Sequence, residues 1–167
     1  MLSQIIKMTS IQKPQLKDLD KVRNILAQWN DEADTEKYFS RVKNEIEGAN
    51  EFNMKFWIAF DKEAIGIIGL CDLSPDLTNF SKTDKPGQLK ILYLDNKKRG
   101  KGNGKKLVEF VEEEARKFGY KEFFVKSAEI YKDTGWGFYE KMVYKSVGLV
   151  DNKTHSGKSN IFGKTLN

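Results

Sequence analysis

Residues 89–127 read "LKILYLDNKKRGKGNGKKLVEFVEEEARKFGYKEFFVKS". The stretch opens with the nearly continuous apolar run 89–94, which favours a strand inside a sheet. After residue 106 the apolar side chains recur at helical spacing, and Gly119 is the kind of residue that ends many helices in a left-handed turn. A second apolar run, 122–127, follows. Strand, helix and strand in this order predict a βαβ unit whose two strands are parallel.

The chain before this unit predicts one short strand and two helices. The strand is expected within residues 5–12, and a helix over 14–29 follows, with Asp18 as its N-cap. The polar segment 30–36 is expected to be a break before a second helix that continues to about Gly48. The apolar stripes of the helices, including the one after the glycines, are Leu16, Leu19, Val22, Ile25, Leu26 and Trp29; Tyr38, Phe39, Val42 and Ile46; Leu107, Phe110, Val111, Ala115 and Phe118.

Two hairpins are predicted on either side of the βαβ unit. The runs 54–60 and 64–73 form the first, and a long loop over 74–88 leads from it to the central strand. A short helix over 133–142 follows the unit, and the runs 144–150 and 160–166 form the second hairpin. This order favours an α+β fold, a mixed sheet with helices on both faces, and argues against a doubly wound Rossmann domain.

Length and composition narrow the class of protein. The chain has 167 residues and a net charge of +5, which predicts a single domain over residues 1–167 with an anionic partner. The single cysteine, Cys71, excludes an internal disulfide and is expected in the core. We expect a cytoplasmic location, because the sequence shows no signal peptide and no apolar run of about 18 residues.

The segment 95–106, "DNKKRGKGNGKK", is the candidate binding loop. It places six Lys or Arg and three glycines between a strand and the start of a helix. The first N–H groups of a helix lack partners, and the helix dipole is positive there, so an anionic phosphate binds if no side chain intervenes. Among the basic residues of this loop, Arg99 is the one we expect to bind the ligand.

The glycine spacing excludes two familiar phosphate-binding patterns. A P-loop requires G-x-x-x-x-G-K-[ST], but Arg99 stands five residues before Gly104, and Lys106 follows Lys105. A Rossmann G-x-G-x-x-G requires a third glycine where Leu107 stands. The pattern that fits is R-x-x-G-x-G, from Arg99 to Gly104.

This pattern resembles motif A of the GNAT family of acetyl-CoA-dependent N-acetyltransferases. Residues 137–144, "GFYEKMVY", resemble that family's FYEKLGF signature, and the element order matches over essentially the whole chain. The resemblance implies a GNAT-like fold: a mostly antiparallel mixed sheet of about seven strands, helices on both faces, and a splayed parallel strand pair at the coenzyme A site. It also implies acetyl-CoA as cosubstrate and no metal.

The resemblance assigns cofactor and substrate residues. The residues implied to contact coenzyme A are Leu92, Tyr93, Leu94, Arg99, Gly100, Lys101, Gly102, Asn103, Gly104 and Lys132. The strand residues offer backbone groups to the pantetheine arm, and the loop binds the pyrophosphate. Asp31, Glu32 and Asp72 lie in segments that border the acceptor groove in the family. Two departures are Val143, where the family has glycine, and Lys132, where many members have asparagine.

The implied reaction is direct attack of a primary amine, in a small molecule or a peptide, on the thioester. Tyr139 would protonate the departing thiolate, and a strand amide near Leu92–Leu94 would stabilise the oxyanion. The general base is unassigned, because the central strand offers Gln88, Lys90 and Tyr93 but no Glu; Asp72 and Asp76 are candidates through water.

Two other interpretations stay open. The basic loop and the aromatic residues also fit a small nucleic-acid-binding protein, although the charge is concentrated at one helix start and no aromatic RNA-binding motif is present. The second interpretation is a GNAT-fold protein that binds acyl-CoA as a sensor, without turnover. With His155 as the only histidine, neither a zinc site nor a Ser–His–Asp triad is expected. We expect no nucleic acid and no membrane among the partners, with a homodimer left open.

Overall fold

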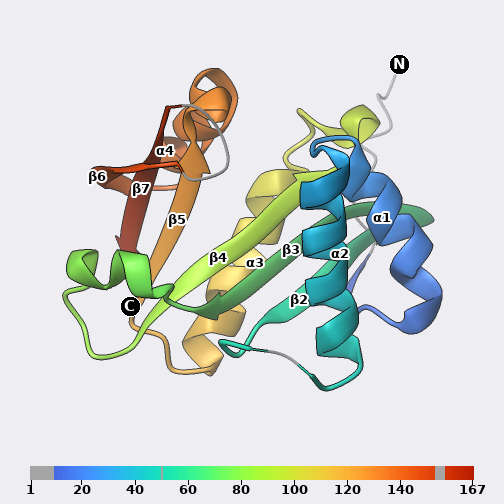
Figure 1. The fold of residues 1–167 in the computed structure, drawn as a ribbon, viewed down its shortest axis with the longest axis horizontal. Helices are drawn as coiled ribbons and strands as arrows, with labels where there is room; N and C mark the ends of the chain where they lie inside the picture. Colours follow the sequence, from blue (N-terminus) through green and yellow to red (C-terminus); the bar gives the residue numbers. More distant parts are fainter. Residues whose placement is uncertain (1–9, 50, 153–156) are drawn as a thin grey trace, which may run out of the picture. The chain divides into compact units, whose positions relative to one another are not determined.

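A computed structural model describes residues 10–49, 51–152 and 157–167 (Figure 1). The chain divides into two compact units, and each is described by itself. The first consists of Met1–Cys71 and Lys90–Val111, and the second of Asp72–Leu89 and Glu112–Asn167. The described strands form one seven-stranded sheet in the order β1-β2-β3-β4-β5-β7-β6. This is the GNAT-like mixed sheet that the resemblance implied.

The elements follow the predicted order. In the first unit they are β1 (Ser10–Gln12), η1 (Leu16–Asp18), α1 (Leu19–Ala27), α2 (Glu32–Ile46), β2 (Lys55–Asp61), β3 (Glu63–Asp72) and η3 (Asn96–Lys98). In the second they are η2 (Pro75–Phe80), β5 (Glu122–Ala128), η4 (Glu129–Tyr131), η5 (Lys132–Trp136), α4 (Gly137–Lys141), β6 (Lys145–Asp151) and β7 (Lys158–Thr165). β4 (Pro86–Leu94) and α3 (Asn103–Lys117) each contribute to both. Residues 5–9 of the predicted first strand lie outside the described residues.

The pairing of the strands confirms the predicted βαβ unit and both hairpins. Residues Pro86–Leu89 of β4 pair in parallel with Glu122–Val125 of β5. β2 pairs antiparallel with β3, and β6 with β7, while β7 also pairs antiparallel with β5. β4 therefore lies inside the sheet, as its continuous apolar sequence predicted.

In the first unit, alternation along the strands gives the sheet two apolar faces. Phe56 and Ile58 of β2 belong to a cluster that contains Val22 of α1 and Val42 of α2. Trp57 points to the opposite face, where its ring meets that of Phe110 in α3, 5.6 Å between centroids. Because successive residues of a strand face opposite sides, the two helix layers cover the two faces (Figure 1).

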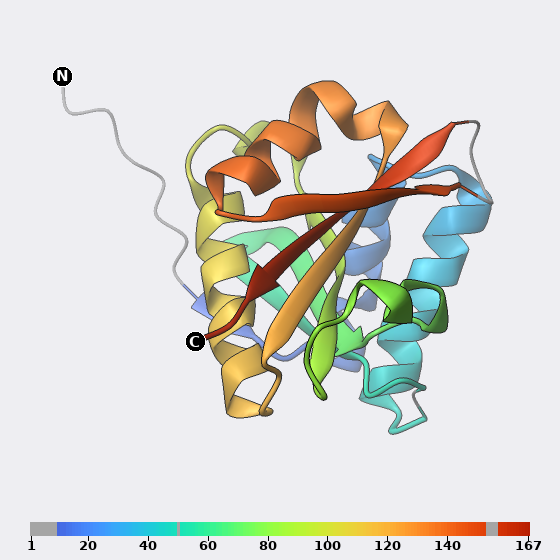
Figure 2. The same cartoon turned by 90° about the vertical axis from the view of Figure 1, so that its left-hand side faces the viewer.

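The second unit is built in the same way around β5 and β7 (Figure 2). On one face, Phe124 and Ile161 pack with Leu77 of η2. On the other, Phe162 meets Tyr139 of α4 at a ring distance of 5.7 Å. The aromatic residue of the FYEK signature is thus buried against the last strand.

Three local predictions need correction. Asp18 takes the predicted N-cap position of α1, but its carboxylate does not cap that helix; it accepts the N–H of Gln15 at 2.9 Å, at the start of the turn η1. The segment 30–36 is a break only as far as Asp31, which caps α2 by accepting the N–H of Asp34 at 2.8 Å. Phe118 is 38% exposed, because α3 ends before it and the chain turns there.

The predicted loop 74–88 also contains regular structure. Pro75–Phe80 form a short 3-10 helix that buries Leu77, and β4 begins already at Pro86. The segment therefore supplies part of the core of the second unit.

Candidate active site

The glycine loop connects the end of β4 to α3 within the first unit. Gly100 and Gly102 have left-handed backbones, with φ of +74° and +78°. The carbonyl of Gly102 accepts the N–H of Lys106 at 3.2 Å, so Gly102 stands directly before α3 and accepts its first helical hydrogen bond. The predicted arrangement of strand, glycine loop and helix start is therefore present.

The loop leaves room for a ligand where a phosphate is expected. Apart from its own neighbours in the chain, a Cβ atom placed on Gly100 or Gly102 would meet no atom of the described residues within 4 Å. At the start of α3, the N–H groups that lack helical partners and the positive end of the dipole favour an anion. These features fit the pyrophosphate of coenzyme A, which needs close approach to the backbone.

The buried side chain of Asn103 links the two ends of the glycine loop by a hydrogen bond. Its side chain is 1% exposed, and its Nδ2 donates to the carbonyl of Lys98 at 3.2 Å. Among the described residues, Oδ1 of Asn103 has no hydrogen-bond partner. The structure thus gives this predicted cofactor residue a role in holding the shape of the loop.

The basic side chains of the loop have different partners. Lys98 lies 3.7 Å from the carboxylate of Asp61, and Lys105 lies 3.9 Å from that of Glu109. The guanidinium of Arg99 instead lies over the indole ring of Trp29, 4.7 Å from its centroid. The ion pairs among the described residues do not include Arg99, so its charge is available to an anionic ligand.

The residues that follow α1, Trp29 and Asn30, hydrogen-bond to the end of β4, and these contacts were not predicted from the sequence. Nε1 of Trp29 donates to the carbonyl of Leu94 at 2.7 Å. The hydroxyl of Tyr93 donates to Oδ1 of Asn30 at 3.2 Å. One signal was available: a tryptophan at the polar end of a helix needs a partner for its N–H when it is half-buried.

The direction of the backbone groups of β4 follows from one hydrogen bond. The N–H of Asp95 donates to the carbonyl of Ile65 in β3 at 2.8 Å. Since backbone groups alternate along a strand, those of Leu92 and Leu94 point away from β3. The carbonyl of Leu94 is already bound by Trp29, which leaves Leu92 as the stronger candidate for contact with a pantetheine arm.

In the second unit, Tyr139 is embedded among aromatic rings. It is 9% exposed, and its ring lies edge-on to those of Phe138 and Tyr144 at 5.2 and 6.0 Å. Burial raises the pKa of its phenol well above the ordinary value. Among the described residues no hydrogen bond fixes the Tyr139 hydroxyl, so its proton is available to a ligand.

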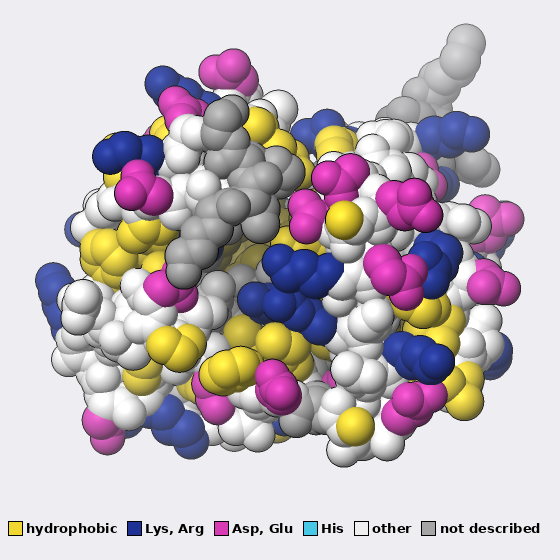
Figure 3. Space-filling view, in the orientation of Figure 1, with side chains coloured by type: hydrophobic (Ala, Val, Ile, Leu, Met, Phe, Trp, Pro, Cys, Tyr) yellow, Lys and Arg dark blue, Asp and Glu magenta, His cyan; other side chains and the backbone are white. Residues whose placement is uncertain are grey.

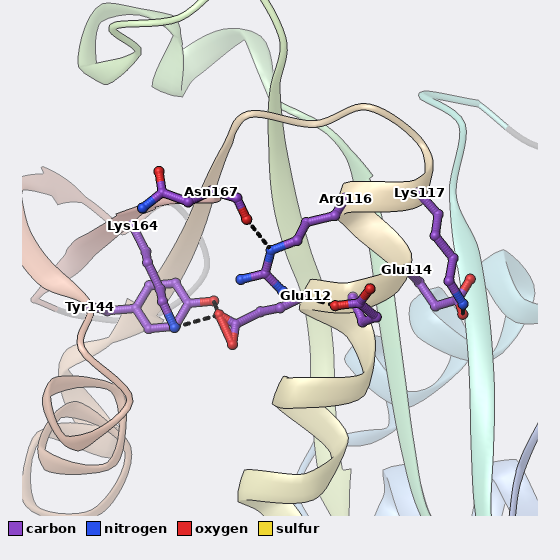
Figure 4. Close-up of polar contacts among 8 residues, drawn as sticks. Glu112, Glu114, Arg116, Lys117, Tyr144, Lys164 and Asn167 are labelled. Carbon is purple, nitrogen blue, oxygen red and sulfur yellow. Dashed lines mark hydrogen bonds and ion pairs between the residues drawn. The ribbon is translucent and has the colours of Figure 1, made fainter.

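Tyr144, whose ring contacts that of Tyr139, belongs to a buried polar cluster that was not predicted from the sequence (Figure 4). Glu112 of α3 is 3% exposed and receives hydrogen bonds from Nζ of Lys164 at 2.7 Å and the hydroxyl of Tyr144 at 3.3 Å. Lys164 also donates to the carbonyl of Met142, at the end of α4. Burial, followed by the charge of Glu112, raises the pKa of Tyr144. The cluster ties α3, α4 and β7 together behind Tyr139.

The helix that carries Tyr139 ends in an unusual way. The N–H of Tyr144 donates to the carbonyl of Tyr139, and that of Val143 to the carbonyl of Glu140, both at 3.0 Å. This is the Schellman arrangement, whose left-handed residue is usually glycine. Here it is Val143, with φ of +69° and 68% exposure.

Lys132 begins η5, a single π-helical turn that leads into α4. It is exposed, and its ammonium lies 6.0 Å from the ring centroid of Trp136. Trp136 in turn donates its N–H to the carbonyl of Ser127 at 3.3 Å. Such turns are frequent at functional sites.

The predicted acceptor residues and proton acceptors mostly have structural partners. Asp31 caps α2, and Glu32 is exposed in its first turn. Asp72 accepts the hydroxyl of Tyr120, and Asp76 pairs with Lys126 at 3.0 Å.

Gln88, on the central strand, is 4% exposed and has a structural task. Its Oε1 accepts the backbone N–H of Ser74 at 3.0 Å and the hydroxyl of the same residue at 2.7 Å. An amide in this position cannot take a proton from an amine. The central strand therefore supplies no general base at this position.

The seven-stranded sheet and a matching family model together identify the class of protein. The chain belongs to the acetyltransferase (GNAT) family, whose model matches residues 19–143. It is therefore an acetyl-CoA-dependent acyltransferase, as the R-x-x-G-x-G loop and the FYEK signature predicted. A comparison with proteins of curated function finds no match.

Solved structures share the fold at low sequence identity. PaiA N-acetyltransferase from Thermoplasma acidophilum, in complex with coenzyme A, is 21% identical with a TM-score of 0.66, over 93% of this chain and 98% of that one. NAA60 from Arabidopsis thaliana, in complex with acetyl-CoA, is 13% identical with a TM-score of 0.74, over 94% and 98%. An aminoglycoside 6'-N-acetyltransferase complexed with coenzyme A is 19% identical with a TM-score of 0.69, over 95% and 98%.

Two further observations concern the described residues alone. They contain no group of three His, Cys, Asp or Glu side chains placed to hold a metal ion. In the same part of the chain, every helix is too short or too polar to cross a bilayer.

Proposed function

We propose that this protein transfers the acetyl group of acetyl-CoA to a primary amine, which attacks the thioester directly while both substrates are bound. The observation that carries the proposal is the glycine loop. Two left-handed glycines leave open space at the start of α3, and Arg99, whose guanidinium lies over the ring of Trp29, belongs to the same loop, in a chain of the acetyltransferase family.

The chain's own residues would divide the work as follows. The first turn of α3 and Arg99 bind the pyrophosphate, and Lys101 adds positive charge. The backbone of Leu92 pairs with the pantetheine arm and helps to orient the thioester for attack. A backbone N–H of this strand stabilises the oxyanion that forms on the thioester carbonyl.

Tyr139 would act on the leaving group. As the new N–C bond forms and the C–S bond breaks, its hydroxyl hydrogen-bonds the thiolate and supplies the proton, which solvent restores. The raised pKa supports this role, because the phenol stays protonated throughout the neutral range. The proton that the amine loses passes to water, since Gln88 and Asp72 are engaged elsewhere.

Thermal unfolding with ligands tests the cofactor. Acetyl-CoA at about 100 times its dissociation constant should add about 2.7 kcal/mol of stability, a rise in Tm of roughly 5–11 °C for a chain of this length. ATP, NAD and a short oligonucleotide at equal concentration should do much less. Greater stabilisation by the oligonucleotide would contradict the proposal. Over the first unit, on the right of Figure 3, acidic and basic side chains are interspersed, which favours a small ligand over a nucleic acid.

Thiol release with a panel of amines tests turnover. Cationic polyamines, lysine-containing peptides and aminoglycosides are the first acceptors to try, because α2 begins with three carboxylates, Asp31, Glu32 and Asp34. Two of the similar structures are aminoglycoside acetyltransferases, which agrees with this choice. Stabilisation by acetyl-CoA without thiol release for any amine would favour a sensor.

The acidic first turn of α2 offers a sharper test of the acceptor class. The triple variant Asp31→Asn, Glu32→Gln, Asp34→Asn removes three charges, and Asn still caps a helix. We expect a higher KM for a cationic amine at low salt, a smaller effect at high salt, and an unchanged KM for acetyl-CoA. Glu36→Gln is the matched control, because Glu36 is paired with Arg23 at 2.6 Å. An unchanged amine KM in the triple variant would exclude this role.

A further inference from the structure

The segment after α1 contacts the cofactor strand and loop through successive side chains. Gln28 reaches Asp95 and Asn96, and Trp29 reaches Leu94 and Arg99. These contacts join residues that lie about seventy positions apart in the chain and belong to one compact unit. The contacts converge on the turn that leads into the glycine loop.

The indole ring of Trp29 is held in place by a hydrogen bond of its own, and it contacts Arg99 in that orientation. The 2.7 Å hydrogen bond from its N–H to the carbonyl of Leu94 sets the orientation of the indole ring. The ring face then receives the guanidinium of Arg99 at 4.7 Å. A guanidinium held over an aromatic ring uses no N–H donor on a carboxylate, so its donors remain available for a phosphate.

Gln28 braces the turn at the base of the loop. Its Nε2 donates to Oδ2 of Asp95 at 3.2 Å, and its Oε1 accepts the N–H of Asn96 at 2.8 Å. Oδ1 of Asp95 accepts the N–H of Lys97 at 2.9 Å, and this bond is the main cause of the lowered pKa of Asp95. Both polar atoms of the Gln28 amide therefore hydrogen-bond to residues 95 and 96, shortly before Arg99 in the chain.

We propose that Trp29 is a positioning residue for cofactor binding: it holds the guanidinium of Arg99 ready for the pyrophosphate of coenzyme A. The inference rests on the proposed function and adds to it a residue outside the R-x-x-G-x-G pattern. Stacking on an aromatic face restricts a long, flexible side chain before the ligand arrives, so less conformational entropy is lost on binding.

A double-mutant cycle tests the proposal. Arg99→Leu should raise the Kd for coenzyme A about 10- to 100-fold, since charged hydrogen bonds are lost. Trp29→Leu should raise it about 3- to 10-fold. Trp29→Phe should be intermediate, because a ring face remains without its N–H. In the double variant, the loss of Trp29 should add less than about twofold to that of Arg99, because the two residues act as one unit.

Matched controls and kinetics separate positioning from general damage. Arg23 lies over the ring of Phe39 at 3.9 Å, so Arg23→Leu and Phe39→Leu repeat the cycle on a similar pair elsewhere in the unit. These controls should leave the Kd for coenzyme A unchanged. For Trp29→Leu, the KM for acetyl-CoA should rise and kcat at saturation should stay within about twofold, which general loss of structure would not produce.

The outcomes are distinguishable by calorimetric titration of each variant with coenzyme A. Additive effects of the two substitutions, or equal weakening by the Arg23 and Phe39 variants, would overturn the role of Trp29 while leaving the proposed function intact. If the wild-type protein binds no coenzyme A, the proposed function fails instead.

Discussion

The glycine loop and the segment around Tyr139 solve opposite structural problems. The loop is exposed, has two left-handed glycines and depends on polar and cation–π contacts from the end of α1. The Tyr139 segment is buried among aromatic rings and backed by the ion pair of Glu112 and Lys164. An extended anion needs open backbone, whereas a single hydroxyl needs a fixed ring. Substitutions in the loop should therefore change affinity, and those behind Tyr139 should change stability.

The largest expected effect is the loss of kcat when only the hydroxyl of Tyr139 is removed. Tyr139→Phe keeps the packed ring and should lower kcat about 10²–10⁴-fold, or slightly less where water substitutes. Tm and the affinity for coenzyme A should hardly change. The raised pKa means that this hydroxyl should cause no loss of kcat below about pH 10, the ordinary tyrosine value. Full activity of the variant would remove Tyr139 from the mechanism, and a large drop in Tm would reduce it to a core residue.

The next effect is on stability. Glu112→Ala leaves Lys164 and the Tyr144 hydroxyl without their buried partner, and we expect a loss of about 3 kcal/mol in unfolding free energy. Denaturant unfolding measures it. Glu113→Ala is the control, because that carboxylate is exposed and pairs with Arg116 on the helix surface. Equal losses for the two variants would show that the buried cluster contributes no special stability.

Substitutions of Gly102 test the glycine loop, where we expect changes in affinity for acetyl-CoA. Gly102→Asn tolerates a left-handed backbone and places a side chain in the open space, so the Tm of the free protein should change little. The rise in Tm on adding acetyl-CoA should be largely lost. Gly102→Val should lose that rise too, with about 1–2 kcal/mol of backbone strain in addition. A normal acetyl-CoA response in both variants would place the phosphate elsewhere.

The smallest effect concerns the end of α4. Val143→Gly removes a left-handed β-branched residue that is mostly exposed, and stability should rise by about 0.5–1 kcal/mol after the entropy cost of glycine. Gly119 ends α3 with the same pair of hydrogen bonds and φ of +85°, so Gly119→Ala should destabilise by a similar amount. Thermal unfolding measures both. A loss of stability in Val143→Gly would mean that the valine side chain packs usefully.

Local patterns were sufficient to predict the two hairpins, the βαβ unit, the glycine loop and the turn at Gly119. Each depends on residues close in sequence: apolar periodicity, a glycine at a helix end, or a fixed motif spacing. The contacts of Trp29 and Glu112 were not predicted, because their partners lie 65 and 52 positions away and only the fold brings them together. The cap formed by Asp31 was missed for another reason, since an acidic run reads equally as a loop and as the first turn of a helix.

Cys71 provides a single thiol whose reactivity can be measured in two assays. Its thiol is 1% exposed in β3 and is the only one in the chain. In the native state, a colour reagent that reacts with thiols should therefore detect released coenzyme A with little background from the protein. Without substrates, slow labelling of the same sulfur should report how often the core around β3 opens, a rate measured at one known atom.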